Sequence, residues 1–161
     1  MHSIIYQVAD HHIYEEDFLD FENITEGDAV SIGYSYKTED ALRERNIRDL
    51  VECYLPKGMF SVNPDLTITY NGGFPEWRKS YLSLLKERTA AITEGTIMEY
   101  VGPVYQLEKA MYNPLNIDRL FVTDYTDGMG IAEQSREFMR FVMKLKPGAV
   151  IHIGAIIGFH N

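Results

Sequence analysis

The stretch that most constrains the fold is the last part of the chain, residues 118–161. An apolar run at residues 120–122 predicts a strand, and residues 124–130 are dense in turn formers. Four apolar side chains then recur at the spacing i, i+3, i+4 and i+7: Phe138, Phe141, Val142 and Leu145. This spacing places them on one face of a helix.

The sequence also predicts where that helix ends and what structure follows it. Pro147 and Gly148 stop the helix, because Pro cannot continue the hydrogen-bond ladder and Gly tolerates the turn. Residues 149–153 then predict a buried strand, and Gly154 and Gly158 divide the apolar tail. We expect such a tail to be tied into the fold, since its exposure would leave an aggregation-prone edge.

A second segment, residues 28–71, follows the same order as residues 118–161. It predicts a strand at 30–34, a helix, and two short strands at 59–62 and 66–70. The helix repeats the apolar spacing of the later one: Ile47, Leu50, Val51 and Tyr54. Both segments therefore predict strand–helix–strand–strand.

Two interpretations of this likeness remain open. A duplicated unit would give a pseudo-symmetric, ferredoxin-like core with a groove between its halves. Alternatively, a helix that ends in Pro and Gly before a strand is an ordinary succession of elements. We favour the second interpretation, because the two segments share few identical residues.

The remaining sequence completes a single α+β domain over residues 1–161. Residues 4–9 predict the first strand, and helices are expected at 75–92 and 103–111, each starting at a Pro. Residues 96–101 fit either a strand or a continued helix. We therefore expect a mixed or mainly antiparallel sheet of short strands covered by about three main helices.

The charge balance limits the class of partner. The chain carries 24 acidic and 15 basic side chains, for a net charge of −9. Direct nucleic-acid binding is disfavoured, because phosphates require clustered Lys and Arg, and an anionic membrane surface is disfavoured for the same reason. The charge suits a basic protein partner, a cationic ligand or simply solubility, and the eleven tyrosines favour a binding surface.

Other features indicate a cytoplasmic protein. No segment reaches the roughly 20 apolar residues that a spanning helix needs, and the start of the chain lacks a secretory pattern. The single cysteine, Cys53, excludes an intramolecular disulfide. Its position in a predicted helix, near the core face, favours a buried and inert thiol.

The first strand is followed directly by Asp10, His11 and His12, which form a possible site for a divalent metal. Imidazole and carboxylate groups this close together can bind zinc, iron or manganese. The spacing does not match a helix-borne metal motif, and adjacent side chains on an extended strand point in opposite directions. A polar turn with solvated histidines is therefore the favoured alternative, although His152 and His160 could join from across the sheet.

The turn with Asp124, Asp127, Gly128 and Gly130 is a second possible ligand site. It lies at a predicted strand-to-helix junction, where free N–H groups can bind anions and two carboxylates can hold a divalent ion that bridges to phosphate. The Walker lysine is missing, and the carboxylates alone would repel a phosphate. Turn geometry already explains the glycines, so a structural role is favoured.

The only tryptophan, Trp77, lies near the start of the 75–92 helix. A role as a ligand-stacking residue is possible, but an anchor in the core is favoured.

Three functional hypotheses follow. We favour a non-catalytic protein-binding module, because no nucleophile elbow or other catalytic constellation is present. The alternative is a small metal- or phosphate-ligand-binding enzyme that uses the His11/His12 turn or the Asp124–Gly130 turn. The third is a homo-oligomer in which the 154–159 strand pairs across a two-fold axis.

Overall fold

The structure is a computed structural model that describes residues 2–161, and it confirms the α+β class with 38% helix and 25% strand. The elements in chain order are β1 (His2–Ala9), β2 (Ile24–Glu26), β3 (Tyr34–Lys37), α1 (Arg43–Asp49), β4 (Phe60–Val62), β5 (Ile68–Tyr70), α2 (Phe74–Ala90), α3 (Pro103–Tyr112), β6 (Arg119–Val122), β7 (Gly130–Ala132), α4 (Ser135–Met143) and β8 (Val150–His160). A π-helical turn, Leu50–Tyr54, continues α1. Short 3-10 turns occupy Glu15–Asp17, Phe21–Asn23, Asp40–Leu42 and Thr126–Gly128.

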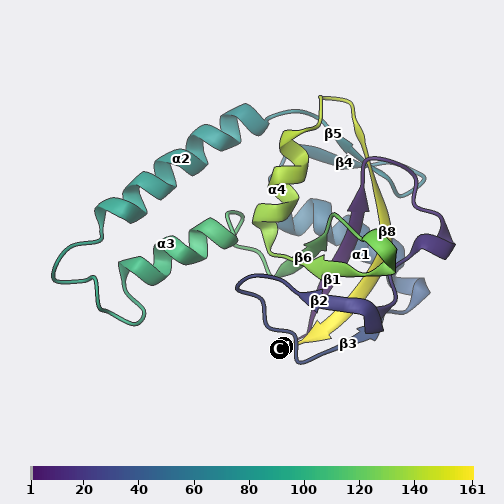
Figure 1. Cartoon of the computed structure of the whole chain (residues 1–161). Helices are drawn as coiled ribbons and strands as arrows, with labels where there is room; N and C mark the ends of the chain where they lie inside the picture. Colours follow the sequence, from purple (N-terminus) through teal and green to yellow (C-terminus); the bar gives the residue numbers. More distant parts are fainter. Residues whose placement is uncertain (1) are drawn as a thin grey trace.

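The main sheet is mixed and has the strand order β4-β5-β8-β1-β6, with β3 also paired to β8 (Figure 1). β1 and β6 run parallel, and every other pair in this sheet is antiparallel. β2 and β7 form a separate two-stranded parallel sheet. The long strand β8 therefore joins most of the sheet together.

One edge of β8 pairs with β1 over residues 152–160, whereas the opposite edge is shared by two short strands. β5 pairs with residues 150–151 and β3 with residues 157–160. Side chains cover the gap between them. Arg43 donates to the carbonyl oxygens of Gly154 and Ile153 at 2.6 Å each, and the Thr38 hydroxyl donates to Ile156 O at 2.6 Å. These bonds satisfy carbonyl groups that would otherwise form an open sheet edge.

The pairing of β1 with β8 contains a bulge that is filled by the side chain of Gln7. The register shifts between Tyr6 and Val8. Gln7 is 1% exposed; its Oε1 accepts hydrogen bonds from the backbone N–H of Leu19 (3.0 Å) and Ala155 (2.8 Å). Its Nε2 donates to Asp17 O at 3.0 Å. A Cβ atom at Gly154 would lie 2.4 Å from Gln7 Oε1, so the bulge requires glycine there.

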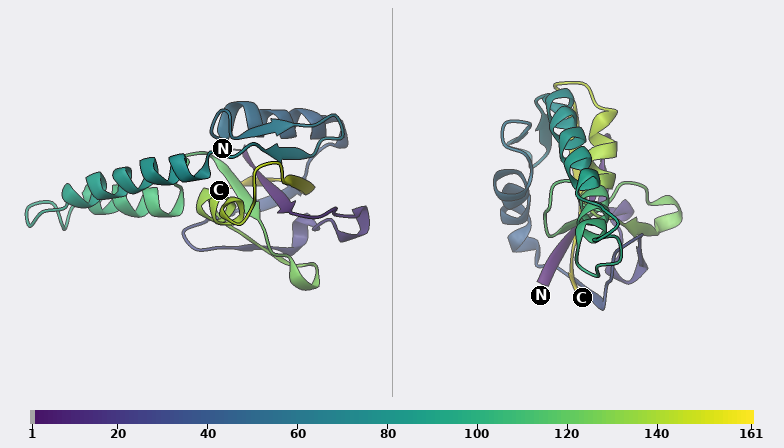
Figure 2. Two further views of the ribbon diagram at one scale, coloured as in Figure 1. Left: turned by 90° about the horizontal axis from the view of Figure 1, so that it is seen from above. Right: turned by 90° about the vertical axis from the view of Figure 1, so that its left-hand side faces the viewer.

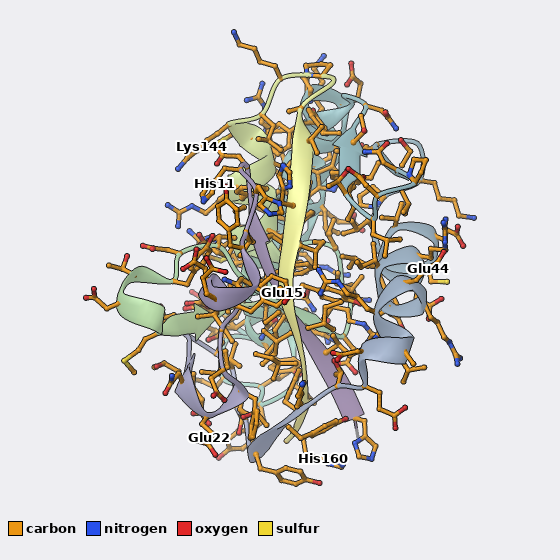
Figure 3. The ribbon with its side chains drawn as sticks, turned by 90° about the vertical axis from the view of Figure 1, so that its right-hand side faces the viewer. His11, Glu15, Glu22, Glu44, Lys144 and His160 are labelled. Atoms are coloured by element: carbon orange, nitrogen blue, oxygen red, sulfur yellow. The ribbon has the colours of Figure 1, made fainter. Side chains whose placement is uncertain are left out.

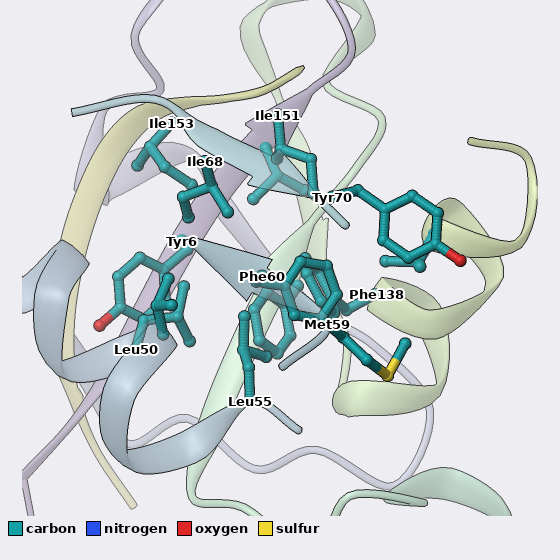
Figure 4. Packing of buried hydrophobic residues seen from close by; sticks show 14 of the residues in the cluster. Tyr6, Leu50, Leu55, Met59, Phe60, Ile68, Tyr70, Phe138, Ile151 and Ile153 are labelled. Carbon is teal, nitrogen blue, oxygen red and sulfur yellow. The ribbon is translucent and has the colours of Figure 1, made fainter. Parts of the chain in front are cut away.

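The bulge also switches the face to which β8 side chains point. Ile151, Ile153 and Ile156 belong to the larger core cluster, which includes residues of α1 and α4 (Figure 4). Ala155 and Ile157 belong to a smaller cluster with β6, β7 and the loop around Leu19. One extra residue in a strand exchanges its inward and outward faces. β8 is thus buried on both faces.

Two helices leave this body as a projecting hairpin. α2 and α3 lie side by side and extend away from the sheet, and residues 91–102 form the far end (Figures 1 and 2). We call residues 74–112 the arm, residues 91–102 its tip, and the rest of the chain the body. Among residues 2–161, no helix is long and apolar enough to cross a membrane.

Several local expectations need correction. The strand expected at 30–34 is instead β3, which starts at Tyr34, and Gly154 and Gly158 lie within one continuous strand. Cys53 is exposed rather than buried, because it lies outside the inward stripe formed by Ile47, Leu50 and Val51.

The ferredoxin-like arrangement is not confirmed. Residues 28–71 contain β3, α1, β4 and β5, in the expected order. Residues 118–161 contain β6, β7, α4 and the single strand β8, because the last two predicted strands are one. The pseudo-repeat and the single-domain assignment remain predictions.

We predict that Gln7→Leu lowers the free energy of unfolding by about 3 kcal/mol or more, because two buried N–H groups and one carbonyl lose their partner. Urea denaturation followed by circular dichroism measures the change. Gln106→Leu, at a half-exposed position on α3, is the matched control and should stay within about 0.5 kcal/mol of wild type. Equal effects of the two substitutions would contradict a structural role for the Gln7 amide.

Candidate functional site

The arm holds together without a buried core of its own. Phe74, at its base, is the one buried residue of α2, and α3 has none. Half-buried apolar side chains lie on the two helices and just after α2: Tyr81, Leu84, Leu85, Ile92 and Leu107. The Tyr81 hydroxyl donates to Ala110 O at 2.9 Å, and the Tyr81 ring stacks on Trp77 at 5.0 Å. The arm is therefore largely exposed to solvent.

A buried hydrogen-bond network fixes the base of the arm to the body. Ser135, at the start of α4, is fully buried, and its hydroxyl donates to Asn113 Oδ1 at 2.6 Å. The same Ser135 oxygen accepts from Leu115 N at 3.1 Å. Asn113 Nδ2 donates to Ile117 O at 2.9 Å. These bonds hold the chain where it returns from α3, so the direction of the arm is defined.

The tip is ordered by its own hydrogen bonds. Thr93 N donates to the Thr96 hydroxyl at 2.9 Å, and the backbone N–H groups of Thr96 and Ile97 donate to Thr93 O at 3.1 and 2.9 Å. Glu99 N donates to Thr96 O at 3.1 Å. A loop fixed in this way loses little conformational freedom when a partner binds it.

This ordered tip presents apolar side chains to solvent. Met98 is 88% exposed, Tyr100 98% and Val101 77%. Further exposed apolar residues lie along the arm: Leu82, Ile97, Val104, Tyr105 and Met111. Single exposed apolar residues are normal, but a cluster on one projecting element is typical of a protein-interaction site. Tyr and Met are also enriched at such interfaces.

The arm and the body differ in charge. The arm carries five acidic and five basic side chains, so the net charge of −9 lies on the body. Within the tip the charged residues are Glu94 and Glu99, with no Lys or Arg. The exposed apolar residues of the tip are therefore accompanied by carboxylates.

The turn after β6 gathers carboxylates rather than anion-binding groups. A cavity of about 380 Å³ is lined by Thr25, Thr123, Asp124, Thr126, Met129, Gly130, Ile131, Glu133 and Glu137. Asp124 accepts from the Thr126 hydroxyl at 2.9 Å, and Asp127 does not line the cavity. Desolvation raises the pKa of Glu133. With no cationic side chain in this lining, the cavity lacks the charge that a phosphate requires.

The glycines of this turn have local explanations. The turn leads into β7 and not directly into a helix, so the expected strand-to-helix junction is wrong. Gly128 has a φ of 73°, in the left-handed region, and Asp127 has a φ of 60°. Gly130 is buried, and a Cβ there would lie 2.5 Å from Val122 Cγ1. Ligand binding by this turn stays a prediction.

The histidines after β1 point to different neighbours. His11 Nδ1 lies 3.0 Å from Asp10 Oδ1, and its Nε2 lies 3.5 Å from the Tyr125 hydroxyl. The His12 ring lies 6.0 Å from the ring of His152, which reaches it from across the sheet. Among residues 2–161 no group of three or more His, Cys, Asp or Glu side chains is arranged to hold a metal ion. A metal at Asp10, His11 and His12 stays a prediction.

Two further expectations can be placed in the structure. Trp77 is half-buried and packs against the larger core cluster and Phe74, while its ring also borders a shallow surface hollow with Glu76 and Ser80. Self-pairing through residues 154–159 is wrong for this strand. β1 and β3 already occupy both edges of its outer part, and Arg43 caps the carbonyl of Gly154.

The sequence did not predict an exposed turn at the tip. Residues 96–101 were expected to be a strand or part of a helix, and the structure places them in a turn. The available signal was an apolar segment between two Pro-started helices, with no third element to cover it. Comparisons of the chain with protein families, curated proteins and solved structures found no match.

The environment of His152 gives a testable pH dependence. Desolvation, and secondarily the neighbouring His12, lower the pKa of His152 from its ordinary value of 6.5. The folded state thus binds fewer protons than the unfolded chain just below pH 6.5, so stability falls as the pH drops from 6.5 toward the lowered pKa. We predict that His12→Gln raises the pKa of His152 toward 6.5 in an NMR titration. His160→Gln is the control, and an unchanged His152 pKa in His12→Gln would contradict the contact.

Proposed function

We propose that this chain is a non-catalytic protein-binding module that contacts its partner with the tip of the α2–α3 arm. The observation that carries the proposal is the exposure of Met98, Tyr100 and Val101 on an internally hydrogen-bonded loop at the end of a projecting element. Aromatic and apolar anchors on a pre-ordered support are the usual source of binding energy in protein interfaces.

The charge around the tip defines the chemistry of the partner. Glu94 and Glu99 border the apolar residues, and the body behind them has a net charge of −9. A matching surface is an apolar cleft bordered by Lys and Arg on a different protein. A second copy of this chain fits poorly, because contact between two tips brings four carboxylates together and like charges disfavour association. Basic partners also associate faster with an acidic protein at low salt.

The partner can be identified by cross-linking from the tip. A photo-reactive amino acid at position 100 should cross-link a protein in cell extract. The same probe at position 82, on the shaft of the arm (the part of α2 and α3 outside the tip), should not cross-link that protein. The cross-linked protein is then purified, and its affinity for the wild-type chain is measured by calorimetry at low and high salt. Association should weaken as salt screens the charges.

Substitutions at the tip should weaken binding strongly and leave the fold intact. We predict that Met98→Ser with Tyr100→Ser weakens binding of the purified partner about a hundredfold or more, because each anchor contributes about 1.4 kcal/mol or more. The matched control is Leu82→Ser with Met111→Ser, which removes exposed apolar groups from the shaft and should change affinity less than threefold. Equal losses of affinity in the two double variants would contradict the proposal that the tip is the contact surface.

The contribution of the tip carboxylates to binding can be tested separately. Glu99→Gln should reduce the salt dependence of the affinity, because one carboxylate at the contact is removed. If native mass measurement instead gives a homodimer that the tip variant dissociates, the partner is a second copy and a basic partner is excluded.

A further inference from the structure

The first and last strands carry a pair of histidines that face one another. His2 on β1 and His160 on β8 are register partners in the antiparallel pairing. Their Nε2 atoms lie 3.0 Å apart, and the ring planes are nearly perpendicular, at 77°. Figure 3 shows His160 at one end of β8, well separated from His11, so this pair is distinct from the histidines after β1.

Two tyrosines of β3 hold the rings in place. The Tyr36 hydroxyl lies 3.2 Å from Nδ1 of His2 and can accept its N–H. Tyr34 stacks on the His160 ring, with centroids 5.0 Å apart and planes at 18°. When Nδ1 of His2 donates to the Tyr36 hydroxyl, the lone pair of His2 lies on Nε2, toward His160. Metal-binding histidines are oriented in the same way, by a partner on the ring nitrogen that does not bind the metal.

The separation of the two nitrogens indicates which metal fits. With metal–nitrogen bonds of about 2.0–2.1 Å, two ligands at right angles lie about 2.9 Å apart, and two at the tetrahedral angle about 3.4 Å apart. The observed 3.0 Å is close to the separation of neighbouring positions of a square-planar or octahedral ion, and rotation of the two rings, whose centroids lie 3.8 Å apart, would aim both nitrogens at one ion. Cu²⁺ and Ni²⁺ prefer imidazole ligands and these geometries, whereas structural Zn²⁺ is tetrahedral.

We propose that His2 and His160 form a two-histidine site for Cu²⁺ or Ni²⁺, which fastens the start of β1 to the end of β8. Both imidazoles bind through Nε2, and water fills the remaining positions, since no third His, Cys, Asp or Glu joins them within residues 2–161. A metal bound to the folded chain and not to the unfolded one stabilises the fold. The site is independent of the arm and of the proposed protein partner.

Thermal unfolding with metal tests the site in tag-free full-length chain. Adding NiCl2 to a hundredfold excess over the dissociation constant measured by calorimetry should raise the Tm by about 5–10 °C. His160→Gln should lose this rise and weaken Ni²⁺ binding at least tenfold. The matched control, His152→Gln, removes a histidine from the other end of β8 and should keep the full rise. CuCl2 is tested in the same series.

The position of the metal is checked independently of stability. Cu²⁺ is paramagnetic, so substoichiometric CuCl2 should broaden NMR signals of residues near His2, Tyr36 and His160 before those near His12 and His152. Broadening that begins at His12, or binding that survives His160→Gln unchanged, would overturn the proposal. So would the absence of any Ni²⁺ or Cu²⁺ binding to the wild-type chain, which would identify the contact as a hydrogen bond between the two imidazoles.

Discussion

The buried amide of Gln7 is the interaction on which the sheet most depends. The bulge between β1 and β8 leaves backbone groups without partners in the ladder, and the Gln7 side chain supplies hydrogen bonds to Leu19, Ala155 and Asp17. A buried polar group is tolerated only when its bonding capacity is met, and this one also satisfies its neighbours. β8 places side chains in two separate cores, one shared with α1 and α4 and the other with β6, β7 and the loop around Leu19.

The body and the arm differ in how much apolar surface they bury and in their net charge. The body buries apolar residues on both faces of β8 and carries the whole net charge. The arm has neither a deep core nor a net charge, and the Ser135–Asn113 network holds the chain where it returns from α3. Elements with few buried contacts are the ones that proteins commonly use for binding.

Much of the local structure was predictable, because it follows from short-range spacing. The periodicity of Phe138 and Val142 predicted α4, and Pro103 marked the start of α3. Errors arose where tertiary contacts override local pattern. Gly154 resembled a strand break and instead makes room for the Gln7 amide. Cys53 was expected in the core, but its outward position depends on how α1 and its π-helical turn lie on the sheet.

For the candidate sites, too, the sequence predicted the chemical groups but not which groups lie next to each other. The sequence identified His11, His12 and the Asp124 turn as chemical groups, but not that Tyr125 reaches His11 or that three carboxylates line one cavity. It contained His2 and His160 without any sign that they meet, because 157 residues separate them and only the β1–β8 pairing joins them.

The sequence by itself determined the α+β class, the positions of the principal helices and the acidic charge, since these depend on composition and on periodicities of a few residues. Tertiary structure alone decided which apolar residues remain uncovered. The segment around Met98 and Tyr100 is apolar enough for a core, yet α2 and α3 carry it away from the sheet. Exposure depends on where the other elements lie, which no local pattern specifies.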